Sequence, residues 1–272
     1  MLKTPHWEMM IVWYFFLGGI AGGAYFTAAI ADVFGEPGDK KVARIGYFIA
    51  LPLVAACGLL LIADLGVPAR FMNMMRVFKF WDPMSIGAWA VGVFGIFTFL
   101  SAALSLSEAL DRARRVVSVI GMFFGFFLAS YTGVLLSSSA MPFWSDARLM
   151  GALFLASGAS TGMAAISLIL FLTGGSAGAG WRKVKRADRY SMIIELALLG
   201  LFLGLLGSAA KPIVTGHFAP LFWGGLVGVG LLVPLVIDFV GHRVKVLSAV
   251  AALLVLAGGF VLRYVVVMSI QS

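Results

Sequence analysis

Eight long apolar runs constrain this chain more than any other feature of its sequence. Each run is roughly 18–25 residues long, the length that a helix needs to cross about 30 Å of hydrocarbon. The runs are Met10–Ala31, Ile45–Leu65, Met84–Leu106, Val116–Leu136, Leu149–Leu172, Ser191–Ala210, Leu221–Val240 and Val244–Met268. They do not alternate as the strands of a membrane barrel do. The sequence therefore predicts an all-α integral membrane protein with eight transmembrane helices.

The composition agrees with this class and excludes several kinds of site. Apolar residues make up 61% of the 272 residues and charged residues 12%, whereas soluble domains are nearer ~45–50% and ~25%. Cys57 is the single cysteine, so this chain supplies no set of thiolates for an iron–sulfur cluster. The net charge of +8 comes mainly from short loops between apolar runs, which indicates membrane topology and no nucleic-acid partner. The first residues lack the pattern of a cleaved signal peptide, so we expect the first run to be the first span.

The distribution of Lys and Arg predicts the orientation. An even number of spans places both termini on one side of the bilayer. Seven of the 20 basic residues fall on that side: Lys3, Arg70, Arg76, Lys79, Arg148, Lys211 and Arg263. The other 13 fall on the opposite side, which the positive-inside rule assigns to the cytoplasm. We therefore expect both termini to lie outside.

A weak internal repeat is visible in two segments rich in small residues. Residues 16–24 (FLGGIAGGA) align with residues 154–162 (FLASGASTG), in the first and fifth runs. One interpretation is a single membrane domain, 1–272, built from two parallel four-helix halves, 1–140 and 141–272. The other is that small residues four apart only let two helices pack closely. Both interpretations remain open at this point.

Polar residues that fall near the outer ends of the runs are candidates for a functional site, because such groups are costly in a bilayer. His6 precedes the first run, Asp64 ends the second, Tyr131 is near the end of the fourth and Lys211 ends the sixth. Arg263 lies five residues from the end of the eighth run, roughly 7 Å below the boundary, and we expect it to pair with Asp64. A histidine, a carboxylate and a tyrosine in apolar surroundings suit a quinone head group, which needs hydrogen bonds and proton exchange. The alternative is that helix ends merely tolerate polar residues, as a snorkelling lysine does.

Four stretches of the chain resemble the NrfD-like family, the membrane subunits of polysulfide reductase and related respiratory complexes. They are Thr4–Glu8 leading into Phe16–Gly19, Asp64–Phe71 with Asn73 and Arg76, Pro83–Ser85, and Tyr131–Ser137. The resemblance covers the first half of the chain well and the second half mainly through helix number and length.

The resemblance implies a quinone-binding subunit in a bacterial or archaeal cytoplasmic membrane, using menaquinone or ubiquinone. It implies no haem or iron–sulfur centre on this chain. An iron–sulfur subunit would dock on the outer side and connect it to a molybdopterin-type catalytic subunit, where substrate catalysis is expected. The family's catalytic positions fall on His6, Asp64 and Tyr131. Arg70 and Arg263 are further candidates for binding the head group.

Two other features have a functional and a structural interpretation. The outer loop before Pro83 holds Arg76, Lys79 and Trp81, a composition typical of docking surfaces and equally of an interfacial belt. Glu195 is expected near the inner end of the sixth helix, where it would start a proton path or pair with a neighbouring cation, Arg189 or Lys185.

Two competing functions are a secondary transporter and a haem-b electron-transfer subunit. Helix interiors nearly free of charge at mid-depth and the absence of paired broken helices argue against a transporter. Haem would need two facing histidines, and of the three present only His6 and His217 lie on the same side.

Overall fold

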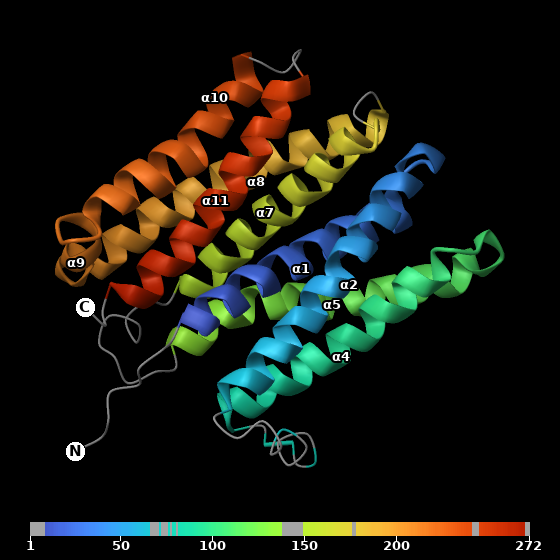
Figure 1. Cartoon of the computed structure of the whole chain (residues 1–272), viewed down its shortest axis with the longest axis horizontal. Coiled ribbons are helices and arrows are strands. Elements are labelled where there is room, and N and C mark those ends of the chain that lie inside the picture. The colour runs from blue at the N-terminus through green and yellow to red at the C-terminus, as the bar shows by residue number, and fades with distance from the viewer. Residues whose placement is uncertain are drawn as a thin grey trace.

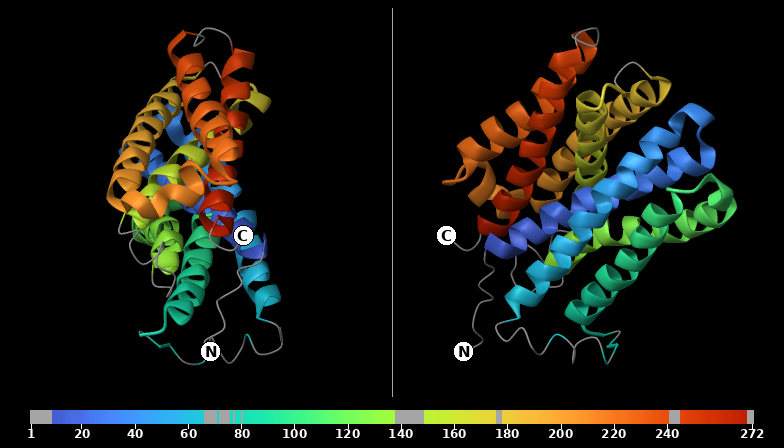
Figure 2. Two further views of the ribbon diagram at one scale, coloured as in Figure 1. Left: turned by 90° about the vertical axis from the view of Figure 1, so that its left-hand side faces the viewer. Right: turned by 45° about the vertical axis from the view of Figure 1, so that its right-hand side comes forward.

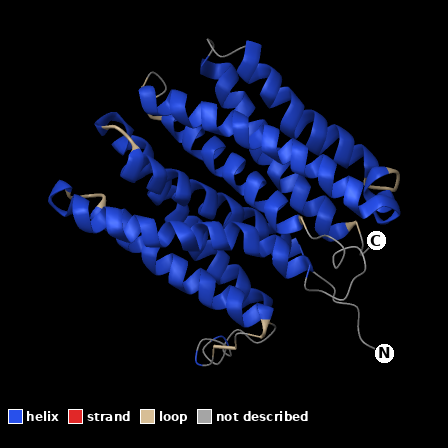
Figure 3. Cartoon of the chain, turned by 180° about the vertical axis from the view of Figure 1, so that it is seen from behind, coloured by secondary structure: helices blue, strands red, loops and turns tan. Residues whose placement is uncertain are grey.

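Eight apolar helices run side by side in the computed structural model (Figure 1), which describes residues 9–65, 71, 76, 78–79, 81–137, 149–175, 178–240 and 245–269. The first half contains α1 (Met9–Phe34), α2 (Lys40–Asp64), α4 (Pro83–Leu104) and α5 (Asp111–Ser137), with short 3-10 turns η1 (Pro37–Asp39) and η3 (Glu108–Leu110). The second half contains α7 (Met150–Leu172), α8 (Ala179–Leu206), η4 (Gly207–Ala210), α9 (Lys211–Val214), η5 (Leu221–Leu232), α10 (Val233–Val240) and α11 (Lys245–Met268). No strand occurs in these ranges (Figure 3), so the predicted all-α class with eight spans is confirmed.

The sixth span begins earlier than predicted. The apolar run suggested a start at Ser191, but α8 begins at Ala179 and includes the basic segment 181–189, which was expected to be a loop. Lys and Arg are good helix formers, and their long stems can lie along the helix while the charges reach the head-group layer. The 28 residues of α8 span about 42 Å, more than the hydrocarbon thickness. Glu195 therefore lies in the middle of the helix and not near its inner end.

The seventh span has the predicted bounds but an unusual first part. Its residues Leu221–Leu232 form a π-helix, η5, which continues into α10. Gly230 of this segment lies so close to Gly258 of α11 that a Cβ on Gly230 would be 2.5 Å from the Gly258 Cα. Glycine at both positions allows this close approach of two backbones. An apolar run looks the same in either helix type, so the sequence did not predict the π-helix.

Helices α1 and α7 form the centre of the molecule. In each, 72% of the apolar window is buried, against 28% in α2 and in α8. The two helices contact each other through the small residues of the aligned segments: a Cβ added to Gly23 would overlap the backbone of Gly158, and one added to Gly162 would overlap the backbone of Gly23. These small residues therefore permit close helix packing, while the repeat and the two halves remain proposals.

The helix ends fall into two groups. The start of α1 and the end of α11 lie toward the same end of the bundle as the start of α4, as the views in Figure 2 show. We call this the terminal end, and the opposite end, where α8 and α11 begin, the basic end. Large apolar side chains such as Phe123, Ile96 and Leu205 are about 60% exposed or more along the flanks, as expected for surfaces that face lipid tails.

Candidate functional site

Tyr131 is held at the terminal end by the first turn of α4. It lies six residues before the end of α5 and is 6% exposed. Its hydroxyl donates a hydrogen bond to the carbonyl oxygen of Pro83, and its ring stacks on Phe127 with 5.2 Å between centroids. A Cβ on Gly87 would lie 2.8 Å from the tyrosine ring, so glycine at this position makes room for it. The phenol is thus fixed between α4 and α5.

The start of α4 is itself well defined by local chemistry. The Asp82 carboxylate accepts a hydrogen bond from the Met84 amide at 3.1 Å, and Pro83 occupies the first turn, where its missing N–H costs nothing. The Ser85 hydroxyl accepts a further bond from the Lys79 amide at 3.1 Å. This capped turn gives Tyr131 a rigid acceptor.

The other predicted residues of this layer are only partly within the described structure. Asp64 is the last residue of α2, at the terminal end, and is half-buried. Tyr131 therefore shares its end of the bundle with this carboxylate. His6 and Arg70 lie outside the described residues, and α1 begins at Met9, three residues after His6.

Arg263 is fully buried and joins three helices. Its guanidinium donates to the carbonyl oxygens of Phe15 in α1 (3.2 Å) and Gly259 in α11 (2.7 Å), and to the Ser157 hydroxyl in α7 (2.9 Å). The ring of Phe154 lies 5.2 Å from the cation. Among the described residues no ion pair joins Arg263 to Asp64, so the expected pairing is wrong. A buried arginine needs several acceptors, and here backbone carbonyls that the sequence does not reveal provide them.

Glu195 faces the same serine from the other side. Its carboxylate is close enough to the Ser157 hydroxyl and to Arg263 to interact with both. The side chain is 3% exposed. The alternative that Glu195 pairs with Arg189 or Lys185 is wrong, because the carboxylate lies about two turns of α8 from Arg189 and about three from Lys185, and both cations contact Asp238 instead.

More buried polar groups continue from Glu195 toward the basic end. Asp188 of α8 accepts a bond from Ser160 at 3.1 Å and lies 3.6 Å from Lys185. Lys185 in turn lies 3.0 Å from Asp238 of α10. We call the set Arg263, Ser157, Glu195, Ser160, Asp188, Lys185 and Asp238 the α7–α8 polar column. Hydropathy alone indicated helices nearly free of charge at mid-depth, and that expectation is wrong.

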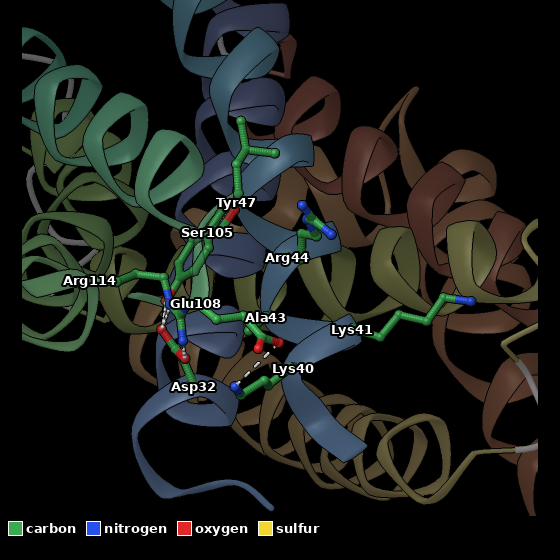
Figure 4. A pocket seen from close by; sticks show the side chains of 10 residues that line it. Asp32, Lys40, Lys41, Ala43, Arg44, Tyr47, Ser105, Glu108 and Arg114 are labelled. Atoms are coloured by element: carbon green, nitrogen blue, oxygen red, sulfur yellow. Dashed lines mark hydrogen bonds and ion pairs between the residues drawn. The ribbon is translucent and has the colours of Figure 1, made fainter. Parts of the chain in front are cut away.

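A second polar cluster closes the first half at its basic end (Figure 4). Arg114 of α5 forms two hydrogen bonds, of 2.8 and 2.7 Å, with Asp32 of α1, and Tyr47 of α2 donates to the same carboxylate at 3.2 Å. Lys40 pairs with Asp111 at 3.0 Å beside a pocket of about 270 Å³. The predicted first run stopped at Ala31, so it excluded Asp32, and the sequence showed no sign that this carboxylate is buried.

The predicted docking residues are exposed at the terminal end. Arg76 and Lys79 are exposed, and Trp81 is 68% exposed. Their exposure is compatible with either a partner or the head-group layer, so docking stays a prediction.

Comparison with known proteins identifies a matching family and several similar proteins. The family model described as "Polysulphide reductase, NrfD" matches residues 1–272. The sequence is 30% identical to one of the polysulfide reductase chains of Wolinella succinogenes, over 99% of this protein and 96% of the relative. It is 28% identical to the NrfD homolog of Haemophilus influenzae, over 89% and 87%. One of the selenate reductase subunits of Mesobacillus selenatarsenatis is 26% identical over 43% of this protein and 28% of the relative.

Proposed function

Because the chain belongs to the polysulfide reductase NrfD family, we propose that it is the membrane subunit of an oxidoreductase complex and exchanges electrons with the quinone pool. Two similar proteins are named as parts of polysulfide and selenate reductases. By analogy, an iron–sulfur subunit docks at the terminal end and leads to a molybdopterin-type catalytic subunit. The terminal end then faces outward from a bacterial or archaeal cytoplasmic membrane.

The observation that supports this proposal best is the placement of Tyr131. Its hydroxyl lies at the terminal end, where α2 ends at Asp64 and where α1 begins, three residues after His6 in the sequence. A quinone head group carries two carbonyl oxygens and takes up two protons on reduction. In the proposed site Tyr131 donates a hydrogen bond, His6 exchanges a proton, and Asp64 orients the imidazole or passes protons to outer water.

The proposed site is tested by removing its proton-handling groups. In the assembled complex, His6→Ala or Asp64→Asn should lower quinol-coupled turnover by about 10²–10⁴-fold, the usual contribution of general acid–base catalysis. Activity with an artificial electron donor to the partner subunits should stay unchanged. If both variants assemble and keep wild-type quinone turnover, the head group binds elsewhere.

The α7–α8 polar column supports a second, coupled proposal. In this column Glu195 lies at the middle of α8, between the basic end and Arg263. A buried carboxylate beside a hydroxyl group can accept and release protons. We therefore propose that Glu195 lies on a proton path from the basic end, which would make turnover electrogenic.

A further inference from the structure

A pocket of about 370 Å³ opens at the basic end between α8, α10 and α11. Trp181 of α8, Asp238 and Phe239 of α10 and Ser248 of α11 form part of its wall. The remaining lining residues are the four cations Arg182, Lys185, Arg186 and Arg189. The lining holds four positive side chains and one carboxylate, so its net charge is positive and the pocket favours an anion.

Several donors in this pocket have no acceptor in the part of the chain that the structure describes. The indole Nε1 of Trp181 and the Nε of Arg189 are buried without a hydrogen bond, and Trp181 is only 9% exposed. Lys185 Nζ is 3.0 Å from Asp238 Oδ1 yet makes no hydrogen bond there. Buried donors are normally satisfied, because leaving one unpaired costs about 1–3 kcal/mol. These three donors outnumber the one unpaired lining oxygen, Asp238 Oδ2, and suit a group with several acceptor oxygens, as a phosphate has.

The geometry of Arg189 fits such a group. Its Nη2 donates to the carbonyl oxygen of Asp238 at 3.0 Å, and its guanidinium lies 4.8 Å from the centre of the Phe239 ring. These contacts hold the guanidinium group in place and leave its Nε available to a ligand. A preorganised guanidinium loses little entropy when it binds a planar or tetrahedral oxyanion.

The surroundings indicate that the ligand is a lipid. Phe239, Val240 and Val246 beside the pocket are 59%, 80% and 62% exposed, and they form an apolar surface on which acyl chains can lie. Basic pockets between transmembrane helices typically bind the head groups of anionic lipids. The pocket at the basic end of the first half differs, because Lys40 and Arg114 there already pair with Asp111 and Asp32.

We propose that the pocket formed by α8, α10 and α11 binds the phosphate head group of an anionic phospholipid. The phosphate oxygens accept hydrogen bonds from Trp181 and Arg189, and Arg186 adds charge at the rim. The lipid joins the first turns of α8 to the α10–α11 pair. This site is independent of the proposed quinone site at the terminal end.

The test is native mass spectrometry of the full-length protein in detergent with added phosphatidylglycerol or phosphatidylcholine. The wild type should retain one phosphatidylglycerol and bind phosphatidylcholine at least about fivefold more weakly. Arg186→Gln should weaken phosphatidylglycerol binding about fivefold, because each basic residue near the surface contributes about that factor. Trp181→Phe keeps an aromatic side chain but removes the indole N–H, and should also weaken binding.

Arg115→Gln is the matched control, because Arg115 is an exposed cation at the same end, on α5. It should leave the retained lipid unchanged, and thermal unfolding should show that all variants are folded. An equal loss in Arg115→Gln, equal binding of phosphatidylcholine, or no retained lipid would overturn the proposal. Displacement of phosphatidylglycerol by millimolar inorganic phosphate, with equal stabilisation, would indicate a site for free anions and overturn the lipid assignment.

Discussion

Tyr131 and Arg263 meet the requirement for hydrogen bonds inside a bilayer in different ways. Tyr131 uses a single acceptor, the carbonyl oxygen of Pro83. Arg263 uses acceptors on three helices and retains no solvent exposure. Tyr131 can therefore donate to a ligand by breaking only its bond to Pro83. Arg263 would have to break several buried hydrogen bonds that join helices. For this reason we assign Arg263 a structural role beside Glu195 and treat contact with the head group as a remaining prediction.

The phenol of Tyr131 gives the first residue-scale prediction. Tyr131→Phe removes one hydrogen bond worth about 1 kcal/mol while the ring keeps its stacking on Phe127. Quinone turnover of the assembled complex should fall about five- to tenfold, less than in the His6 and Asp64 variants. Tyr190→Phe, at an exposed tyrosine on α8, serves as the control. Unchanged quinone kinetics in Tyr131→Phe would contradict a contact between this hydroxyl and the head group.

At the scale of helices, small residues decide how closely α1 can approach α11 and its arginine. A Cβ on Gly19 would lie 2.5 Å from Nη2 of Arg263, and the guanidinium cannot move without losing buried bonds. Gly19→Ala should therefore destabilise the protein by about 1–3 kcal/mol, measured by thermal unfolding in detergent.

The matched control is Gly200→Ala in α8, where an added Cβ meets nothing within 4 Å. It should be neutral or slightly stabilising, because alanine favours helix. Similar unfolding temperatures for the two variants would show that Arg263 can relocate freely.

The placement of Glu195 in the middle of α8 gives a second prediction at this scale. Glu195→Gln keeps a hydrogen-bonding side chain of the same shape beside Ser157 but cannot carry a proton through the column. The initial rate at which membrane potential builds up during quinol turnover should fall on the order of a hundredfold if protons pass this residue. Glu108→Gln, at a side chain that is 91% exposed, should have no effect. If potential and turnover are both untouched in Glu195→Gln, the proposed path does not run through this residue.

At the scale of the whole molecule, charge asymmetry between the two ends predicts orientation. The basic end carries the first turns of α8. Lys183 of this segment forms ion pairs with two carboxylates between α1 and α2, Asp39 at 2.8 Å and Glu36 at 3.3 Å. A reporter that is active only outside the cytoplasm should be active when fused after Ser272 and silent when inserted at Gly175. The opposite pattern would place the proposed quinone layer on the cytoplasmic side.

The sequence by itself determined the number of spans, their class and most of their bounds, although α2 and α5, like α8, begin earlier than predicted. Hydropathy and length are local properties, and a lipid environment allows long apolar segments few structures other than helices. The same local reasoning failed at the start of α8, where a helix extends through charged residues into the head-group layer, and it could not detect the π-helix η5. Short motifs likewise indicated the family and the candidates Asp64 and Tyr131, because motifs too are local features.

Only the tertiary structure decided which buried polar groups meet. Phe15, Ser157 and Arg263 are far apart in the sequence, and the acceptors of Arg263 other than Ser157 are backbone carbonyls, whose availability does not depend on residue type. The unpartnered donors of Trp181 and Arg189 are also invisible in a list of residues, because a missing hydrogen bond is a property of the packed surroundings. Apolar content determines that a segment enters the membrane. Pairing of the few polar groups within it depends on how the helices pack, which is a cooperative property of the whole bundle.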